Sequence, residues 1–140
     1  MNRIQKIEVI IEKNEDHFWG RIENKGFMPT GQGETVTALS QNLKDSIVDY
    51  IKHEGKEDKF WSKVDVKSIE FKILYDLVAF FEEFSDLKIS SIAPRAGLNP
   101  SLVRQYVTGS KYPSPEQAKK IEEALHSLGK KLQEVTIFAA

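Results

Sequence analysis

Alternation of apolar and polar residues, broken at Ile10, predicts β-strands in the first part of the chain. Three stretches alternate in this way: 3–13, 17–23 and 68–74. In the first of them, Ile7, Val9 and Ile11 form one apolar face, as expected for a strand that covers a core on one side. Residues 14–16 have turn chemistry, which predicts an antiparallel return of the chain. The glycine-rich and proline-containing segment 24–34 is predicted to be a loop with room for a short third strand.

Helical spacing replaces this alternation after residue 34. Thr35 is a candidate N-cap for a helix that ends near Lys52, because apolar residues recur every three or four positions between them. One face of this helix is expected to cover the sheet. Residues 53–67 are rich in charge and contain a glycine, so they are predicted to be an exposed charged linker despite Phe60 and Trp61.

The remainder of the chain is predicted to be all-helical. Asp76 can cap a helix that runs to Phe84, and Ser114 followed by Pro115 is the clearest helix start in the sequence. Apolar positions of the last helix are spaced alternately by three and four residues: Ala118, Ile121, Leu125, Leu128, Leu132 and Val135. The part beyond Gly129 can stay uncovered in a monomer, which favours a homodimer contact. The fold class is therefore α+β, with a β-β-(β)-α-β domain over 1–75 and a helical domain over 76–140.

Residues 89–109 have the pattern of a helix-turn-helix. Such a motif needs a small residue where the two helices cross and a glycine or asparagine at the bend. Ala93 can be the crossing residue and Gly97 the bend, while Asn99 can cap the second helix with Pro100 at its first position. The apolar anchors would be Ile92, Leu98, Val103 and Tyr106, and Gly109 would end the second helix. Two ordinary core helices joined by a turn would give a similar pattern.

Charge supports DNA binding by this segment. Between residues 87 and 120 there are six basic residues and one acidic residue, a local charge of +5 in a chain whose net charge is −1. Duplex DNA binds such surfaces because phosphate contacts release counterions. Ser101 and Gln105 share one helix face, and glutamine can pair with adenine. The candidate DNA-binding residues are Asn99, Pro100, Ser101, Arg104, Gln105, Thr108, Lys111 and Tyr112. For each of them, the alternative is a solvent-exposed side chain with no binding role.

The two halves together resemble the HicB family of bacterial antitoxins, in the form with a C-terminal phage-repressor-type helix-turn-helix. In the first half the likeness rests on Gly33-Glu34-Thr35 before a helix that contains Asn42, although Ala38 and Leu39 replace the family's usual acid and alanine. In the second half it rests on several short motifs: Asp76-Leu77, Phe80-Phe81, Arg95-Ala96-Gly97, Asn99-Pro100-Ser101, Arg104-Gln105-Tyr106, Gly109 and Gln117-Ala118-Lys119-Lys120-Ile121-Glu122. Pro94 departs from the pattern, since a proline in a helix interior costs about 3 kcal/mol.

The resemblance implies a partial ribonuclease-H-like fold over 1–75 that lacks catalytic acids and blocks a HicA-type messenger-RNA-cleaving toxin. It also implies that 76–140 binds operator DNA and represses the chain's own operon as a dimer. A regulator whose first domain senses a small ligand or another protein is the alternative. An adjacent reading frame that encodes a small basic protein would favour the antitoxin. An inhibitor whose helix-turn-helix is degenerate at Pro94 and a nuclease are further hypotheses.

The residue inventory gives little support for an enzyme. The chain has no cysteine, and its three histidines lack metal-ligand spacing, so we expect no metal site and no cofactor. Gly31-Gln32-Gly33 before a helix is weak evidence for a phosphate site, because two glycines are common in loops. Trp19, Phe27 and Trp61 are candidate partner-binding aromatics, with core packing as the alternative for each. With no membrane-length apolar run and no signal-peptide pattern, a cytoplasmic location is expected.

Overall fold

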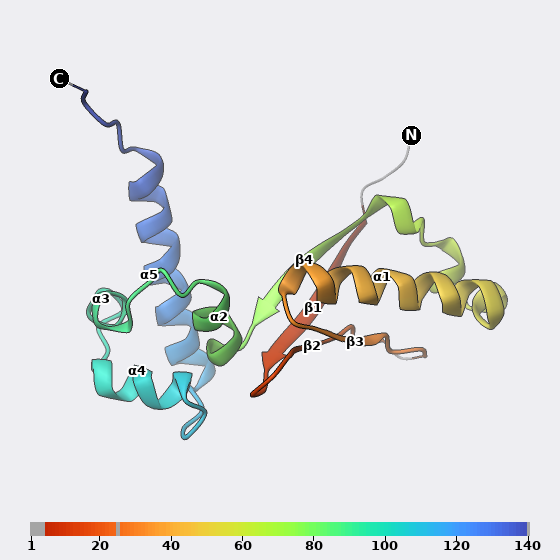
Figure 1. The fold of residues 1–140 in the computed structure, drawn as a ribbon, viewed down its shortest axis with the longest axis horizontal. Helices are drawn as coiled ribbons and strands as arrows, with labels where there is room; N and C mark the ends of the chain where they lie inside the picture. The colour runs from red at the N-terminus through yellow and green to blue at the C-terminus, as the bar shows by residue number, and fades with distance from the viewer. Residues whose placement is uncertain (1–4, 25, 140) are drawn as a thin grey trace. The chain divides into compact units, whose positions relative to one another are not determined.

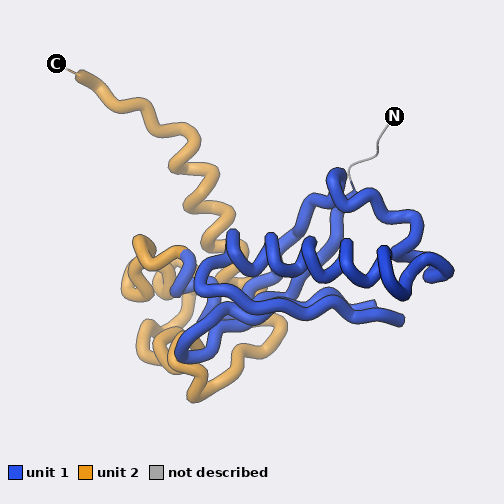
Figure 2. Tube along the Cα trace, turned by 45° about the vertical axis from the view of Figure 1, so that its right-hand side comes forward, with its two compact units in different colours: residues 1–83 blue, residues 84–140 orange. Residues whose placement is uncertain are grey.

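The computed structural model describes residues 5–24 and 26–139 and divides into two compact units, 1–83 and 84–140 (Figure 2). The architecture is mixed α+β, with a four-stranded sheet in the first unit and three helices in the second. The predicted boundary falls after residue 75, whereas the units divide after Glu83. The difference arises because the intervening helix α2 (Leu77–Glu83) packs with the sheet: Ala79 is fully buried in the core of the first unit.

The sheet of the first unit has the strand order β3-β2-β1-β4 (Figure 1). Its strands are β1 (Gln5–Lys13), β2 (Phe18–Arg21), β3 (Thr30–Gly33) and β4 (Ile69–Tyr75). β1 lies antiparallel to β2 and parallel to β4, and β2 lies antiparallel to β3. The predicted buried positions Ile7, Val9 and Ile11 are buried, which confirms the alternation. Residues 3 and 4 of the first predicted strand lie outside the described residues.

Helix α1 (Val36–His53) covers one face of this sheet (Figure 1). The predicted cap is confirmed, because Thr35 Oγ1 accepts a hydrogen bond of 3.0 Å from Ala38 N. Leu39 lies on the buried side of α1 and approaches β3 closely. A Cβ atom on Gly33 would lie 2.5 Å from Leu39 N, so a glycine is required there for strand and helix to pack. Gly33 therefore has a packing role, the alternative to a phosphate site.

The prediction of an exposed linker over 53–67 is wrong for Trp61 and Val64, which are buried, although most of the segment is exposed. This segment folds into the short 3₁₀ turns η1 (Gly55–Glu57), η2 (Trp61–Lys63) and η3 (Val66–Ser68). Trp61 has an exposed fraction of 0% and belongs to the sheet–helix core. Its indole Nε1 donates to Phe27 O at 3.1 Å. The segment is ordered because it buries a large aromatic side chain whose polar atom is satisfied.

Asp58 organises these turns. Its Oδ1 accepts from the backbone N of Phe60 at 2.9 Å and of Trp61 at 3.0 Å, and its Oδ2 accepts from the Tyr50 hydroxyl at 2.8 Å. The hydrogen bond from Trp61 N, followed by that from Tyr50, lowers the pKa of Asp58. The ionised carboxylate thus holds the turn that inserts Trp61 into the core.

The second unit consists of α3 (Ile89–Arg95), α4 (Pro100–Val107) and α5 (Pro115–Gln133). Its buried side chains come from all three helices: Ile92, Ala93, Val103, Tyr106, Ile121 and Ala124. The predicted start of α5 is confirmed by the 3.2 Å hydrogen bond from Gln117 N to Ser114 Oγ. Beyond Gly129 every described residue is exposed, including Leu132 and Phe138, so that this end of the helix and the tail are uncovered in the single chain. Across the described residues, no helix combines the length and apolarity needed to cross a bilayer.

Candidate nucleic-acid interface

The turn between α3 and α4 is built on a glycine with a left-handed backbone. Gly97 has φ +71°, a conformation that other residues rarely adopt. Gly97 N donates to Pro94 O at 3.0 Å, and Leu98 N donates to Ala93 O at 2.9 Å. These two bonds satisfy the last carbonyl groups of α3 and reverse the chain direction. Ala93 is fully buried at this point, as predicted for a residue where two helices approach.

Pro94 lies in the second turn of α3, since the helix begins at Ile89. The proline has no N–H to donate to Ser90 O, the carbonyl four residues earlier. The side chain of Pro94 is exposed, and the carbonyl of Pro94 takes part in the turn that follows. The helix therefore continues through Pro94 to Arg95, and the bend follows at Gly97.

The start of α4 is fixed as the sequence predicts. Asn99 Oδ1 accepts from Ser101 N at 2.8 Å, and Pro100 occupies the first helical position. On the inner side Val103 and Tyr106 are buried. The Tyr106 hydroxyl donates to Gln117 Oε1, a link between α4 and α5. This role of Gln117 was missed, because the sequence places it only in the capping pattern of α5.

The outer side of α4 carries three of the eight predicted DNA-binding residues. Ser101, Arg104 and Gln105 are all exposed, and Ser101 and Gln105 lie one helical turn apart. Their side chains carry a hydroxyl, a guanidinium and an amide. The hydroxyl and the amide can both donate to and accept from base edges in the major groove, and the guanidinium can donate to them. Pro100 is half-buried, and Asn99 is exposed but uses its Oδ1 for the cap.

Residues 108–112 fold back over the end of α4. Gly109 has φ +80°, and Gln105 O accepts from Lys111 N at 3.1 Å. The Thr108 hydroxyl lies 3.3 Å from the same carbonyl, so Thr108 helps to close the helix as well as being exposed. The side chains of Lys111 and Tyr112 are exposed beside the C-terminal end of α4. A lysine in this place can contact a backbone phosphate next to a groove occupied by the helix.

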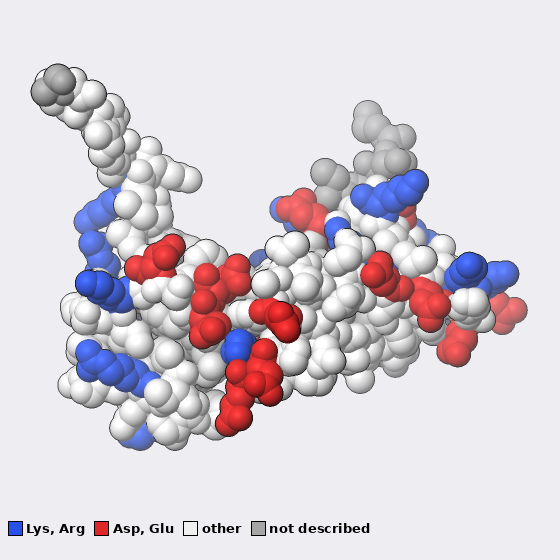
Figure 3. Space-filling view, viewed as in Figure 1, with Lys and Arg blue, Asp and Glu red and all other residues white. Residues whose placement is uncertain are grey.

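The two units have net charges of opposite sign. The sequence of 84–140 has eight basic and five acidic residues, a net charge of +3, whereas 1–83 has twelve basic and sixteen acidic residues, a net charge of −4. Figure 3 shows lysine and arginine side chains gathered along the border of the second unit that carries α3 and α4. Six basic residues belong to residues 87–120: Lys88, Arg95, Arg104, Lys111, Lys119 and Lys120. Among the described residues, none of these six forms a salt bridge within 4.0 Å.

The predicted partner-binding aromatics of the first unit have different surroundings. Trp19 is 45% exposed on β2. Phe27 is half-buried and stacks on Tyr50, with ring centroids 3.8 Å apart. Trp61 is fully buried, so its prediction as a partner-facing residue is wrong and core packing is its role. Only Trp19 of the three presents a large exposed surface.

Candidate metal ligands are dispersed among the described residues. Over residues 5–24 and 26–139, no group of three or more His, Cys, Asp or Glu side chains is placed to hold a metal ion. His53 pairs with Asp49 at 3.4 Å, and His126 lies 4.0 Å from Glu122, on separate helices. Comparisons with protein-family models, with curated proteins and with solved structures found no match to this chain. The case for function therefore rests on the residues and their geometry.

Proposed function

We propose that this chain is an antitoxin of the HicA/HicB type. Its first unit binds and occludes a small, basic, messenger-RNA-cleaving toxin, and its second unit binds operator DNA and represses its own operon. In this proposal the first unit is a partial ribonuclease-H-like domain, and α3 and α4 form a helix-turn-helix. The protein acts in the cytoplasm by binding alone, without catalysis or a cofactor.

The observation that carries the DNA-binding half is the outer surface of α4. Arg104 and Gln105 are exposed whereas Val103 and Tyr106 are buried, and Arg104 is one of six basic residues within 87–120 that form no salt bridge in the described part of the chain. A helix held at its start by Asn99 and at its end by Gly109 presents these groups on a rigid support. Rigid placement favours base recognition, since little ordering remains to be done on binding.

The opposite charges of the units support two different partners. A net charge of +3 suits a phosphate backbone, while a net charge of −4 suits a protein that itself binds RNA through basic residues. We further propose that the operator is bound by a homodimer. Two recognition helices then reach half-sites about one helical turn of DNA apart, and the exposed end of α5 offers apolar surface for the contact.

Co-expression tests the antitoxin half. The adjacent reading frame expressed alone should arrest growth, and growth should return when this chain is supplied. The purified chain should also stop RNA cleavage by that product at equimolar amounts, as occlusion requires. Growth arrest that persists with abundant soluble chain would leave the ligand-sensing regulator as the better account.

Gln105→Ala is expected to lower the affinity for operator DNA by about 1–3 kcal/mol, with binding to random DNA unchanged. The reason is that the substitution removes the hydrogen bonds between the glutamine amide and one specific base. Fluorescence anisotropy with both DNAs measures the two affinities. An equal loss on both would assign Gln105 to the DNA backbone instead.

Lys111→Ala is the matched contrast. Its ammonium group is expected to contact a phosphate, so affinity should fall alike for operator and random DNA. The slope of log K against log salt should become less steep by about one. An unchanged salt slope would show that Lys111 makes no phosphate contact.

A further inference from the structure

The face of the sheet opposite α1 carries the outward-pointing residues of all four strands. Register pairs place these residues in rows: Gln32, Trp19 and Glu12 form one, and Thr30, Arg21, Ile10 and Leu74 form the next. α1 packs on the other side, through Leu39 and Leu43. Four strands give this face a width of about 14 Å. It is large enough for a protein contact to be centred on it.

Trp19 is the exposed aromatic of this face. It leaves 45% of its surface in solvent, although tryptophan is among the residues that gain most from burial. Glu12 lies directly opposite Trp19 on β1. Arg21 is two residues further along β2, so its side chain rises on the same face about 7 Å away. An aromatic ring bordered by charged groups is typical of an anchor at the centre of an interface.

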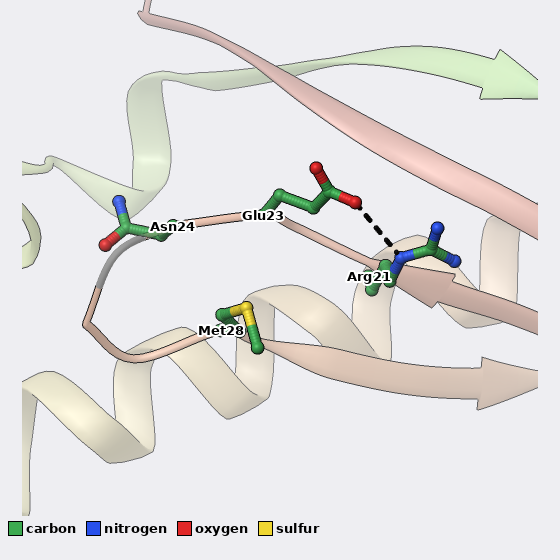
Figure 4. A pocket seen from close by; sticks show the side chains of 4 residues that line it. All are labelled: Arg21, Glu23, Asn24 and Met28. Carbon is green, nitrogen blue, oxygen red and sulfur yellow. Dashed lines mark ion pairs between the residues drawn. The ribbon is translucent and has the colours of Figure 1, made fainter.

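A hollow of about 420 Å³ lies where β2 ends and the loop to β3 begins (Figure 4). It is lined by Arg21, Glu23, Asn24 and Met28. Met28, 57% exposed, forms an apolar wall, and Glu23 extends toward the guanidinium of Arg21. The hollow can therefore accept a long side chain with an apolar stem and a polar end.

The charged groups here are arranged as carboxylate, guanidinium and carboxylate. Arg21 Nη1 lies 2.9 Å from Glu12 Oε1, and Arg21 Nε lies 3.5 Å from Glu23 Oε1. One arginine between two carboxylates leaves one negative charge in excess. Since the whole unit also has a net charge of −4, the face attracts a cationic partner. It would repel a nucleic acid, and a second copy would bring the same excess negative charge against it.

The geometry points to this face, defined by Trp19, Glu12, Arg21, Glu23 and Met28, as the docking surface for the basic toxin. A partner arginine or lysine would lie in the hollow with its cation at Glu23 and its stem against Met28, while Trp19 is buried under the partner's surface. The inference rests on the proposed function and adds to it the surface that performs the occlusion. The toxin's RNA-binding cations are the groups that such a surface would cover.

Titration calorimetry of the purified full chain with the product of the adjacent reading frame tests this assignment. Trp19→Ala is expected to weaken binding by about 30-fold, as for a central aromatic anchor. Val48→Ala is the matched control, because Val48 is also 45% exposed but lies on α1. Its affinity should equal that of the wild type. Unchanged circular dichroism and thermal midpoint would exclude unfolding as the cause.

Charge is tested separately with Glu23→Gln. Binding should weaken by about 3- to 10-fold, mainly through slower association, and the difference should shrink at high salt. Glu57→Gln, an exposed acid on η1, should change neither rate. A wild-type chain that does not bind the toxin would overturn the proposed function. Wild-type binding that Trp19→Ala and Glu23→Gln leave unchanged, or a change of oligomeric state in Trp19→Ala alone, would overturn only the docking surface.

Discussion

Trp61→Ala is expected to destabilise the first unit by about 3–5 kcal/mol, the usual cost of truncating a buried tryptophan to alanine. Trp61 is fully buried, and the substitution also leaves Phe27 O without its indole donor. Denaturant unfolding followed by circular dichroism measures the loss. Because a domain has only about 5–15 kcal/mol of stability, this loss removes a large part of it, and toxin neutralisation should fall with the folded fraction of the first unit.

A neighbouring variant separates this effect from simple loss of an aromatic ring. Phe60 is 39% exposed and contacts Trp61 edge to face, with ring centroids 4.8 Å apart. Phe60→Ala should cost about 1 kcal/mol, since it removes a partly hydrated ring and one aromatic contact. A loss of the same small size for Trp61→Ala would contradict the placement of the 53–67 segment in the core.

The reciprocal change in the second unit is Ile121→Ala, with an expected cost of about 2–5 kcal/mol. Ile121 is 1% exposed and comes from the helix against which α3 packs. Losing it should loosen α3 and the turn at Gly97, so operator binding should disappear. Leu132→Ala is the control, since Leu132 lies on the same helix but is 60% exposed. It should leave the unfolding midpoint of the dilute protein nearly unchanged.

Together these two variants examine whether the units act separately. The sheet and α1 enclose one hydrophobic core, and α3, α4 and α5 contribute buried residues of their own. Trp61→Ala should therefore weaken neutralisation and spare operator binding, while Ile121→Ala should do the reverse. Loss of both functions in each variant would show that the units fold as one.

Local chemistry explains which elements the sequence predicts well. Thr35, Asn99 and Ser114 each accept a hydrogen bond from a backbone N–H two or three residues ahead, and each begins a helix where expected. The period-two pattern of β1 likewise needs only neighbouring residues. The left-handed bend at Gly97 follows from its lack of a Cβ atom.

The burial of Trp61 and Val64 within 53–67 does not follow from periodicity, because 3₁₀ turns have no apolar period to detect. Its signal was of another kind: Phe60, Trp61 and Val64 are more apolar surface than a solvated linker needs, and Asp58 stands three residues before Trp61 as a turn cap. The predicted boundary between the units lies before α2, because the sequence does not show whether Ala79 packs in the core of the first unit or of the second. The contact between Tyr106 and Gln117 is likewise tertiary, and no spacing rule predicts it.

The candidate surfaces likewise follow from the sequence only where they depend on local spacing and not on tertiary contacts. The exposed row on α4 follows from helical spacing once Val103 and Tyr106 are assigned to the core. The hollow at Arg21, Glu23 and Met28 does not, because it depends on how the loop between β2 and β3 is placed. Of the three aromatic candidates, only Trp19 has the alternation of a strand to place it outward, opposite to Phe18 and Gly20.

Binding of the full chain to the DNA upstream of its own reading frame tests the central claim most directly, with a scrambled duplex of equal composition as competitor. The upstream DNA should bind at least about 1,000-fold more tightly than the scrambled duplex, and both affinities should fall steeply between 50 and 200 mM salt. Equal affinity for the two duplexes, or no salt dependence, would contradict the assignment of α4 as a base-reading helix.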